Sequence, residues 1–373
     1  MTRDSRHVGR YDLVTPMIPR RDEILAGVER LLASGSYILG EEVRALEQEI
    51  AAACCVEDAV GVASGSSALE IALQIAGVGP GSEVITTAYT FIATIEAVIR
   101  LGATPVFVDI RPGDLNIDTK LVAEAITERT RVILPVHIFG VPCAMDELLA
   151  IAGAHDLVIV EDMCQAFGSL YRGMPCGSFG RMSCLSFYPT KNLPGIGDGG
   201  MLLCRRKEDA DLARRLRNHE TIRVGGELVS GWNHRLDEIQ ALAIRTRLAR
   251  FGDEQADRDR AAALYNGLIP TSCRLETPDP STGIRVTHHQ YWIRVPDRGR
   301  LLTRLSEAGV EFGLYYDPPL HRHALAERCR ISGSLEQTVL AGNEVLALPI
   351  HQALADDDAV RIGTLVREFL TGN

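Results

Sequence analysis

The sequence predicts an α/β fold in which helices cover both faces of a mostly parallel central sheet. Short apolar runs rich in β-branched residues recur at regular intervals between residues 59 and 206, and helical patterns separate most of the earlier ones. Nearly continuous apolar strands between helices are typical of a parallel sheet that is buried on both faces. The last two runs are joined by a short glycine-rich connection, which fits one antiparallel strand.

The N-terminal part of the chain accounts for this sheet. Two helical patterns, at about 20–33 and 40–54, come before it. A further helix is expected from Ser66 to Ala76, because apolar residues recur there at i, i+3, i+4 and i+7 and Gly77 follows as a stop. Strands are expected at 59–64, 83–87, 104–110, 131–140, 157–162, 182–189 and 199–206.

The C-terminal part predicts a smaller α+β domain. A long polar helical stretch begins after residue 235, and the strands HQYWIRV (289–295) and EFGLYY (311–316) flank a helix near 299–308. We place the domain boundary near residue 250, in the long helical stretch, so that residues 1–250 form the large domain and 251–373 the small one. The segment 218–233 contains glycines and lacks clear periodicity, and we interpret it as a loop.

Composition and charge narrow the function classes. The chain is 46% hydrophobic and 24% charged, as in ordinary globular proteins, and its net charge of -10 argues against a nucleic-acid partner. The N-terminus lacks the apolar segment of a signal peptide, and no apolar run is long enough to span a bilayer, so no membrane partner is expected. Nine cysteines without a C-x-x-C pair predict reduced thiols in a cytoplasmic protein, with neither disulfides nor a metal site.

The first candidate site segment is ASGSSALEIAL, where Ser64, Gly65, Ser66 and Ser67 follow a strand and open a helix. Unpaired backbone N–H groups at a helix N-terminus, with hydroxyls beside them, form an anion site that suits a phosphate. A plain serine N-cap is the structural alternative, and it is common. The segment alone leaves both interpretations open.

Two further segments place candidate ligands at strand ends. Tyr89 or Phe91 in TTAYTFIAT could lie flat on a planar ring, because ligands of such sheets bind there, although core packing explains both residues as well. Asp162 ends the strand LVIVED, and Gln165 follows one turn later. A carboxylate at the end of a buried strand is costly unless it is paired, for example with a protonated heterocyclic nitrogen. A helix-capping aspartate is the alternative.

The fourth segment is FYPTKNLPGIGDGG, which contains one of only three lysines in the chain. A bias toward arginine codons would explain this scarcity, so it carries no weight by itself. Lys191 follows a strand and has apolar neighbours, which suits a surface lysine poorly. An amine can lose its proton and act as a nucleophile, whereas a guanidinium cannot. Ser186 precedes the lysine in the same segment of the chain.

Together the four segments predict a pyridoxal 5'-phosphate (PLP) site, because each supplies one part that this cofactor needs. The serines would hold the phosphate, an aromatic ring would fix the cofactor plane, and Asp162 would keep the pyridine nitrogen protonated. Lys191 would form a Schiff base with the aldehyde. The combination is much more specific than any single segment.

At this point the chain resembles the DegT/DnrJ-type sugar aminotransferases, a branch of the fold type I PLP enzymes. The resemblance covers nearly the whole chain and rests on motifs that occur in order, namely SGSYILGEEVRALEQEIA, SGSSALEIAL, GPGSEVITTAYTFIAT, EDMCQAFGS, SFYPTKNL followed by GDGG, GWNHRLDEIQAL, PPLH and LPIH. It implies the PLP fold type I and a homodimer with shared active sites. The segment 218–233 would then lie near the site of the other subunit.

The resemblance also implies roles for the residues around the cofactor ring. Lys191 would be the Schiff-base lysine. Asp162 would pair with the ring nitrogen, and Gln165 would lie beside the ring hydroxyl. Phe91 would stack on the ring, with Tyr89 as the weaker candidate.

Further residues would hold the phosphate or the substrate. The resemblance assigns Ser66, Ser67 and Ser186 to the phosphate. It also implies that Asn233, in GWNHR, reaches the phosphate from the neighbouring subunit. The candidates for the sugar pocket are Tyr315, Tyr316 and His321. Packing between the two domains explains these last residues equally well.

The implied reaction is a transamination in two halves. L-Glutamate, or glutamine, would leave its amino group as pyridoxamine 5'-phosphate, and a nucleotide-linked keto-deoxysugar, with dTDP as the first candidate, would accept it. A keto-cyclitol such as an inosose is an alternative acceptor that the motifs do not separate. Dehydratase relatives replace the lysine with histidine, so Lys191 argues against that activity. A PLP-binding regulator would need a DNA-binding or sensor segment, and the sequence has no spare domain or basic patch for one.

Overall fold

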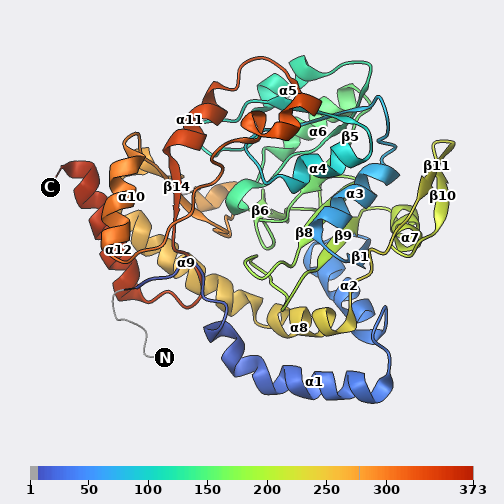
Figure 1. Cartoon of the computed structure of the whole chain (residues 1–373), viewed down its shortest axis with the longest axis horizontal. Coiled ribbons are helices and arrows are strands. Elements are labelled where there is room, and N and C mark those ends of the chain that lie inside the picture. The colour runs from blue at the N-terminus through green and yellow to red at the C-terminus, as the bar shows by residue number, and fades with distance from the viewer. Residues whose placement is uncertain (1–6, 277, 373) are drawn as a thin grey trace.

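A computed structural model of the chain describes residues 7–276 and 278–372, with an eight-stranded sheet at its centre (Figure 1). The strands lie in the order β1-β9-β8-β5-β4-β2-β3-β13. They are β1 (Asp58–Val62), β2 (Glu83–Thr87), β3 (Thr104–Val108), β4 (Thr130–Ile133), β5 (Val158–Asp162), β8 (Met182–Ser186), β9 (Gly200–Cys204) and β13 (Arg330–Ile331). Only β9 runs antiparallel to its neighbours, β1 and β8, so the predicted mostly parallel sheet is confirmed.

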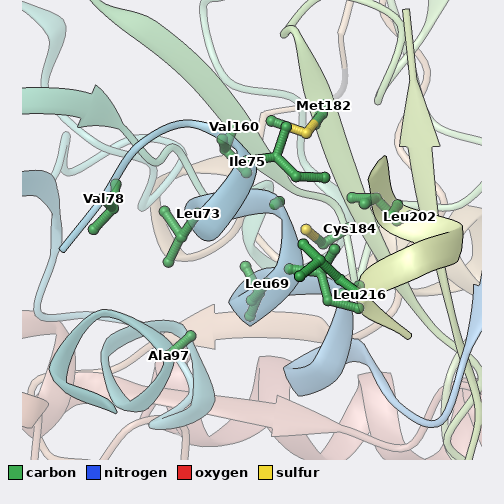
Figure 2. Packing of buried hydrophobic residues seen from close by; sticks show 14 of the residues in the cluster. Leu69, Leu73, Ile75, Val78, Ala97, Val160, Met182, Cys184, Leu202 and Leu216 are labelled. Carbon is green, nitrogen blue, oxygen red and sulfur yellow. The ribbon is translucent and has the colours of Figure 1, made fainter. Parts of the chain in front are cut away.

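One face of the sheet is covered by α3 (Gly65–Ile75), α4 (Ala93–Arg100) and α7 (Lys207–Leu216). Successive side chains of a strand point to opposite faces, and Val160, Cys184 and Leu202 point to this one. They belong to the same hydrophobic cluster as Leu69 of α3 and Leu216 of α7 (Figure 2). The helix α3 is apolar on nearly all sides because it is enclosed by the sheet, α4 and α7.

The opposite face is covered by two groups of helices. The first group is α2 (Glu41–Ala53) and α8 (Glu238–Leu248), which pack with Met201 and Leu203 of β9. The second is α5 (Thr119–Ala125) and α6 (Met145–Ala154), which pack with Ile133 and Ile159. The helix α1 (Arg21–Ser34) contacts α8 from outside, along the lower edge of the molecule in Figure 1.

The C-terminal residues build a smaller unit around a separate hydrophobic cluster. The helices α9 (Phe251–Leu268) and α10 (Arg298–Glu307) both contact α12 (Asp356–Thr371). Beside them, β12 (Tyr291–Arg294) pairs antiparallel with β14 (Val345–Leu348), and α11 (Glu336–Glu344) precedes β14. The long helical stretch is in fact two helices, since α8 ends at Leu248 and α9 begins at Phe251. The domain division near residue 250 stays a prediction.

Two predicted elements are wrong. The segment 218–233 is not a loop, because β10 (Thr221–Val224) and β11 (Glu227–Ser230) pair as a hairpin that extends from the body of the molecule (Figure 1). Its turn residues Gly225 and Gly226 have positive φ angles of 58° and 95°. Two-residue turns with positive φ angles match the twist of the paired strands, and glycine adopts these angles readily. The expected strand 311–316 forms only an isolated bridge, between Gly313 and Ala347, because the chain then turns away toward the site described below.

Several short elements connect the larger ones. The sequence did not indicate the small hairpin of β6 (Leu170–Tyr171) and β7 (Met174–Pro175). The 3-10 helices are η1 (Thr15–Arg20), η2 (Ile138–Gly140), η3 (Thr271–Cys273), η4 (Pro280–Thr282), η5 (Leu320–Arg322) and η6 (Ala324–Arg328). Within the described ranges, no helix combines the length and the apolar character needed to cross a membrane.

Candidate active site

A pocket of about 390 Å³ lies at the carboxyl ends of β5 and β8, beside the N-termini of α3 and α4. Ligands of open α/β sheets bind at this edge. Most of the residues predicted from the sequence meet here, namely Ser66, Phe91, Asp162, Gln165, Ser186, Lys191, Tyr315 and Tyr316. Three predicted residues, Ser67, Asn233 and His321, are not among those that line it.

The N-terminus of α3 forms one wall of the pocket. Ser64 is its N-cap, and its hydroxyl accepts a hydrogen bond from the backbone N–H of Ser67 at 3.1 Å. The Ser67 hydroxyl lies 3.0 Å from both the Ser64 hydroxyl and His234 Nδ1, so it serves the cap rather than the pocket. A Cβ on Gly65 would lie 2.9 Å from Cys164 Sγ and from the Cβ of Ser186, so only glycine leaves this wall its present shape. The backbone N–H groups, Ser66 and Ser186 therefore fit a phosphate.

Asp162 is a buried carboxylate that faces the pocket, with 5% of its surface exposed. The Thr94 hydroxyl donates to Oδ2 at 2.8 Å, and the backbone N–H of Cys164 donates to Oδ1 at 3.2 Å. Among the described residues, no lysine, arginine or histidine forms an ion pair with it. A buried anion without a cationic partner is costly, and a protonated ring nitrogen in the pocket would supply that partner. Asp162 therefore fits the pyridine nitrogen of PLP.

Gln165 is fixed by two hydrogen bonds at the back of the pocket. Its Oε1 accepts from the backbone N–H of Phe139 at 2.9 Å, and its Nε2 donates to the Tyr316 hydroxyl at 2.9 Å. Burial raises the pKa of the Tyr316 hydroxyl, so that group stays protonated at neutral pH. The Tyr316 ring lies nearly parallel to that of Phe139, at an interplanar angle of 11°. These contacts hold Tyr316 as a rigid wall.

The structure separates the two aromatic candidates for a ring plate. Phe91 lines the pocket and is 55% exposed, so its ring is available to a ligand. Tyr89 is fully buried, packs edge-on against Phe139 and Tyr316, and donates its hydroxyl to the carbonyl of Tyr315. Tyr89 therefore belongs to the core, which is one of the two interpretations that the sequence allowed for it.

Lys191 lines the pocket and also a second one of about 300 Å³. Its backbone N–H bonds to the carbonyl of Tyr188 at 2.8 Å, in the turn after β8. In the described parts of the chain, its side-chain amine makes no hydrogen bond or ion pair. Arg247 and Arg258 also line the second pocket, and burial lowers the pKa of Arg258 to about 10. The lysine amine thus lies free at the junction of two pockets.

The structure adds site residues that sequence reasoning missed. Tyr11 lines both pockets, and its hydroxyl lies 2.9 Å from that of Tyr315. His289 lines the first pocket, and burial followed by the charge of Lys191 lowers its pKa well below the ordinary value. Thr94 was missed although it lies in the motif that contains Phe91. Tyr11 and His289 carry no local signal, because only the fold brings them to the lysine.

The two predicted residues that lie farther out differ in their surroundings. Asn233 is exposed, follows the β10–β11 hairpin and does not line the pocket of its own chain. His321 lies in η5, and burial lowers its pKa. Neither residue is brought to Lys191 within one chain.

Comparison with known proteins agrees with this geometry. The model of the DegT/DnrJ/EryC1/StrS aminotransferase family matches residues 19–367. The UDP-N-acetyl-3-dehydro-α-D-glucosamine 3-aminotransferase of Acidithiobacillus ferrooxidans is 38% identical over 97% of both chains. The dTDP-3-amino-3,4,6-trideoxy-α-D-glucose transaminase of Streptomyces venezuelae is 39% identical, over 94% of this chain and 92% of its own. The crystal structure of S. venezuelae DesV in complex with a ketimine intermediate superposes with a TM-score of 0.91 at 38% identity, covering 98% of this chain and 99% of that one.

Proposed function

Because the chain belongs to the DegT/DnrJ/EryC1/StrS aminotransferase family, and is therefore a PLP-dependent aminotransferase, we propose that it transfers an amino group from L-glutamate to a nucleotide-linked keto-sugar. The observation that carries the proposal is one pocket that joins the Lys191 amine to the buried Asp162 carboxylate. An amine without a partner and an anion without a cation are the two groups that PLP chemistry requires of a protein.

The residues of the pocket fit the cofactor in one orientation. Ser66, Ser186 and the N-terminus of α3 would hold the phosphate, and Asp162 would hold a proton on the ring nitrogen. Phe91 would cover one face of the ring. When bound, PLP supplies an aldehyde and a ring that withdraws electrons from the reacting carbon.

Lys191 would carry the proton in the chemical steps. Its amine would take the proton from the α-carbon of the amino-acid donor, and it would return the proton, as an acid, to the ring-side carbon that carries the aldehyde in PLP. The amine has no competing hydrogen bond to any residue in 7–276 or 278–372, so it can move between these positions. His289 beside it would stay neutral, because burial lowers the pKa of the imidazole. A neutral His289 does not repel the protonated form of Lys191.

Both proposed substrates are anions, and the second pocket suits them. Glutamate carries carboxylates, and a nucleotide-linked sugar carries a diphosphate. Arg247 and Arg258 lie buried on the wall of the second pocket that also contains Lys191. Arg247 is already paired with Glu254 at 2.6 Å, whereas Arg258 forms no ion pair among the described residues and is the better candidate to bind an anion. The chain as a whole is acidic, so this local positive charge, rather than the net charge, would guide the substrates.

The names of the two relatives guide the choice of sugar. Both names specify amination at carbon 3 of the sugar, one on a UDP carrier and the other on a dTDP carrier. We propose a 3-keto-sugar, with dTDP as the first candidate nucleotide and UDP as the second. A keto-cyclitol acceptor stays the alternative, and the Tyr315 and Tyr316 wall suits either ring.

The test is a half-reaction assay with purified enzyme that L-glutamate has first converted to the amino form of the cofactor. We expect a 3-keto-sugar nucleotide to restore the absorbance of the aldehyde form, and a 4-keto-sugar nucleotide and scyllo-inosose to do so far more slowly. The dTDP and UDP sugars are compared in the same series. Faster reaction with the cyclitol than with every sugar nucleotide would contradict the proposed substrate class.

We also propose a homodimer whose active sites are shared. Trp232, Phe91 and Tyr188 expose 62%, 55% and 51% of their surface beside the hairpin and the pocket, and exposed apolar groups of this kind mark interaction surfaces. Asn233 is exposed and does not line the pocket of its own chain, which leaves it available for a contact with the cofactor phosphate of a partner.

Asn233→Ala tests this contact. We expect the variant to remain dimeric and to bind PLP about tenfold less tightly, since it loses one hydrogen bond to a charged group, worth roughly 1.5 kcal/mol. Sedimentation velocity gives the mass, and PLP titration gives the affinity. The control is Asn218→Ala, because Asn218 lies opposite Asn233 in an isolated β-bridge. This variant should bind PLP with the wild-type affinity. Unchanged PLP binding by Asn233→Ala would remove the proposed contact.

A further inference from the structure

Glu161 and His137 form a buried pair beside Asp162 that the proposed chemistry does not use. Both side chains are fully buried, and His137 Nε2 lies 2.9 Å from Glu161 Oε2. Glu161 and Asp162 are neighbours in β5, so their side chains point to opposite faces of the sheet. Glu161 therefore lies behind the pocket wall, where neither cofactor nor substrate reaches it.

The Glu161 carboxylate is fully satisfied by hydrogen bonds. Its donors are the backbone N–H groups of Gly177 (2.9 Å), Phe179 (2.9 Å) and Gly180 (2.6 Å), the hydroxyl of Ser183 (3.0 Å) and the imidazole of His137. Burial by itself raises the pKa of Glu161, but His137 and the backbone donors outweigh it and lower the pKa below the ordinary value. An ionised group held this firmly fixes the elements around it.

His137 connects this carboxylate to the backbone of Asp162. The backbone N–H of Cys143 donates to Nδ1 at 3.0 Å, so Nε2 carries the proton that is donated to Glu161. The backbone N–H of His137 donates to the carbonyl of Asp162 at 3.1 Å, and the N–H of Asp162 donates to the carbonyl of Pro135 at 2.9 Å. Both the N–H and the carbonyl of Asp162 are thus hydrogen-bonded to the segment 135–137.

We propose that Glu161 and His137 are positioning residues, which lock the segment 135–137 against β5 and so keep the Asp162 carboxylate aligned with the cofactor ring. The bonds from Thr94 and Cys164 orient the carboxylate only if the backbone of Asp162 stays where it is. A carboxylate that rotates or withdraws holds a proton on the ring nitrogen less firmly. The inference rests on the proposed role of Asp162 toward that nitrogen.

The test uses holoenzyme loaded with PLP that is labelled with nitrogen-15 in the ring, because the chemical shift reports whether the ring nitrogen is protonated. His137→Asn keeps an acceptor for Cys143 but no longer reaches Glu161, whereas His137→Gln keeps an N–H donor toward the carboxylate. We expect His137→Asn to move the resonance toward the unprotonated value and to weaken PLP binding about tenfold, as for groups that orient metal ligands. We expect His137→Gln to restore most of both properties.

Two controls separate this role from general stability and from the role of Asp162 itself. Tyr265→Phe removes a buried hydrogen bond of 3.0 Å to the carbonyl of Pro349 in the C-terminal unit, and should lower the melting temperature without moving the resonance. Asp162→Asn should move the resonance fully, and if it does not, the role of Asp162 fails rather than that of the pair. Glu161→Gln replaces His137→Asn if the latter does not fold.

The outcomes then decide the proposal. A shifted resonance in a folded His137→Asn or Glu161→Gln enzyme, with recovery in His137→Gln, supports it. A wild-type resonance and wild-type PLP affinity in a folded pair variant overturn it, whatever the melting temperature. Failure of both variants to fold also overturns it, because the pair would then be a general requirement of the fold.

Discussion

Replacing Lys191 with alanine is expected to lower the rate of transamination by about 10³-fold or more, because the variant loses both its covalent attachment point and the group that moves the proton. The side chain makes no hydrogen bond or ion pair within the described residues, so its removal leaves no buried partner unsatisfied. We therefore expect the melting temperature of the Lys191→Ala protein to stay near that of the wild type. Loss of activity without loss of stability distinguishes a catalytic lysine from a structural one.

Borohydride reduction followed by proteolysis and mass spectrometry of the peptides gives an independent readout. Wild-type enzyme should gain the mass of the reduced cofactor on the peptide that contains Lys191, and the Lys191→Ala variant should not. Added methylamine should restore part of the proton transfer in the variant, since a small amine fits the space that is left. Lys120→Ala, at an exposed position of α5, is the matched control and should behave as wild type. A Lys191→Ala enzyme that transaminates at the control rate would contradict the assigned role.

The sequence predicts the sheet and the residues of the site that lie at strand ends. The apolar runs predicted the strand positions because their side chains are buried on both faces, as Ile159 and Val160 of β5 illustrate by packing into different hydrophobic clusters. Asp162, Ser186 and the strand preceding Lys191 could be placed together for the same reason, since the carboxyl ends of parallel strands meet at one edge. Local sequence patterns were therefore sufficient to place those site residues whose position follows directly from the direction of a strand.

Sequence patterns were insufficient where a side chain is brought in by distant packing. Tyr11 precedes every predicted element, and His289 belongs to the C-terminal unit, yet both line the pocket with Lys191. Ser67 is a different case, because its place in a serine run predicted a phosphate ligand, whereas its hydroxyl bonds to Ser64 and His234 and it does not line the pocket. The sequence also assigned no role to Glu161, the neighbour of Asp162. Only the burial and hydrogen bonds of Glu161 show that it has a different partner.

Asp162→Asn is the second substitution with a large expected effect. Asparagine has the same shape and can keep an acceptor for Thr94 or Cys164, but it carries no charge to hold a proton on the ring nitrogen. We expect the rate of transamination to fall by about 10²-fold, comparable with the loss of one preorganised electrostatic contact in other enzymes. Stopped-flow measurement of the half-reaction with L-glutamate isolates the chemical step.

The same substitution is expected to act in the opposite direction on the stability of the cofactor-free protein. Asp162 is buried without a cationic partner among the described residues, so its charge is costly until the cofactor binds. Removing the charge should therefore leave the melting temperature of the apoenzyme unchanged or raise it, while the stabilisation gained on adding PLP should shrink. Comparing apo and holo melting temperatures for wild type and Asp162→Asn tests both signs at once. If Asp162→Asn strongly destabilised the apoenzyme, the role of the carboxylate would be to stabilise the fold and not to bind the cofactor.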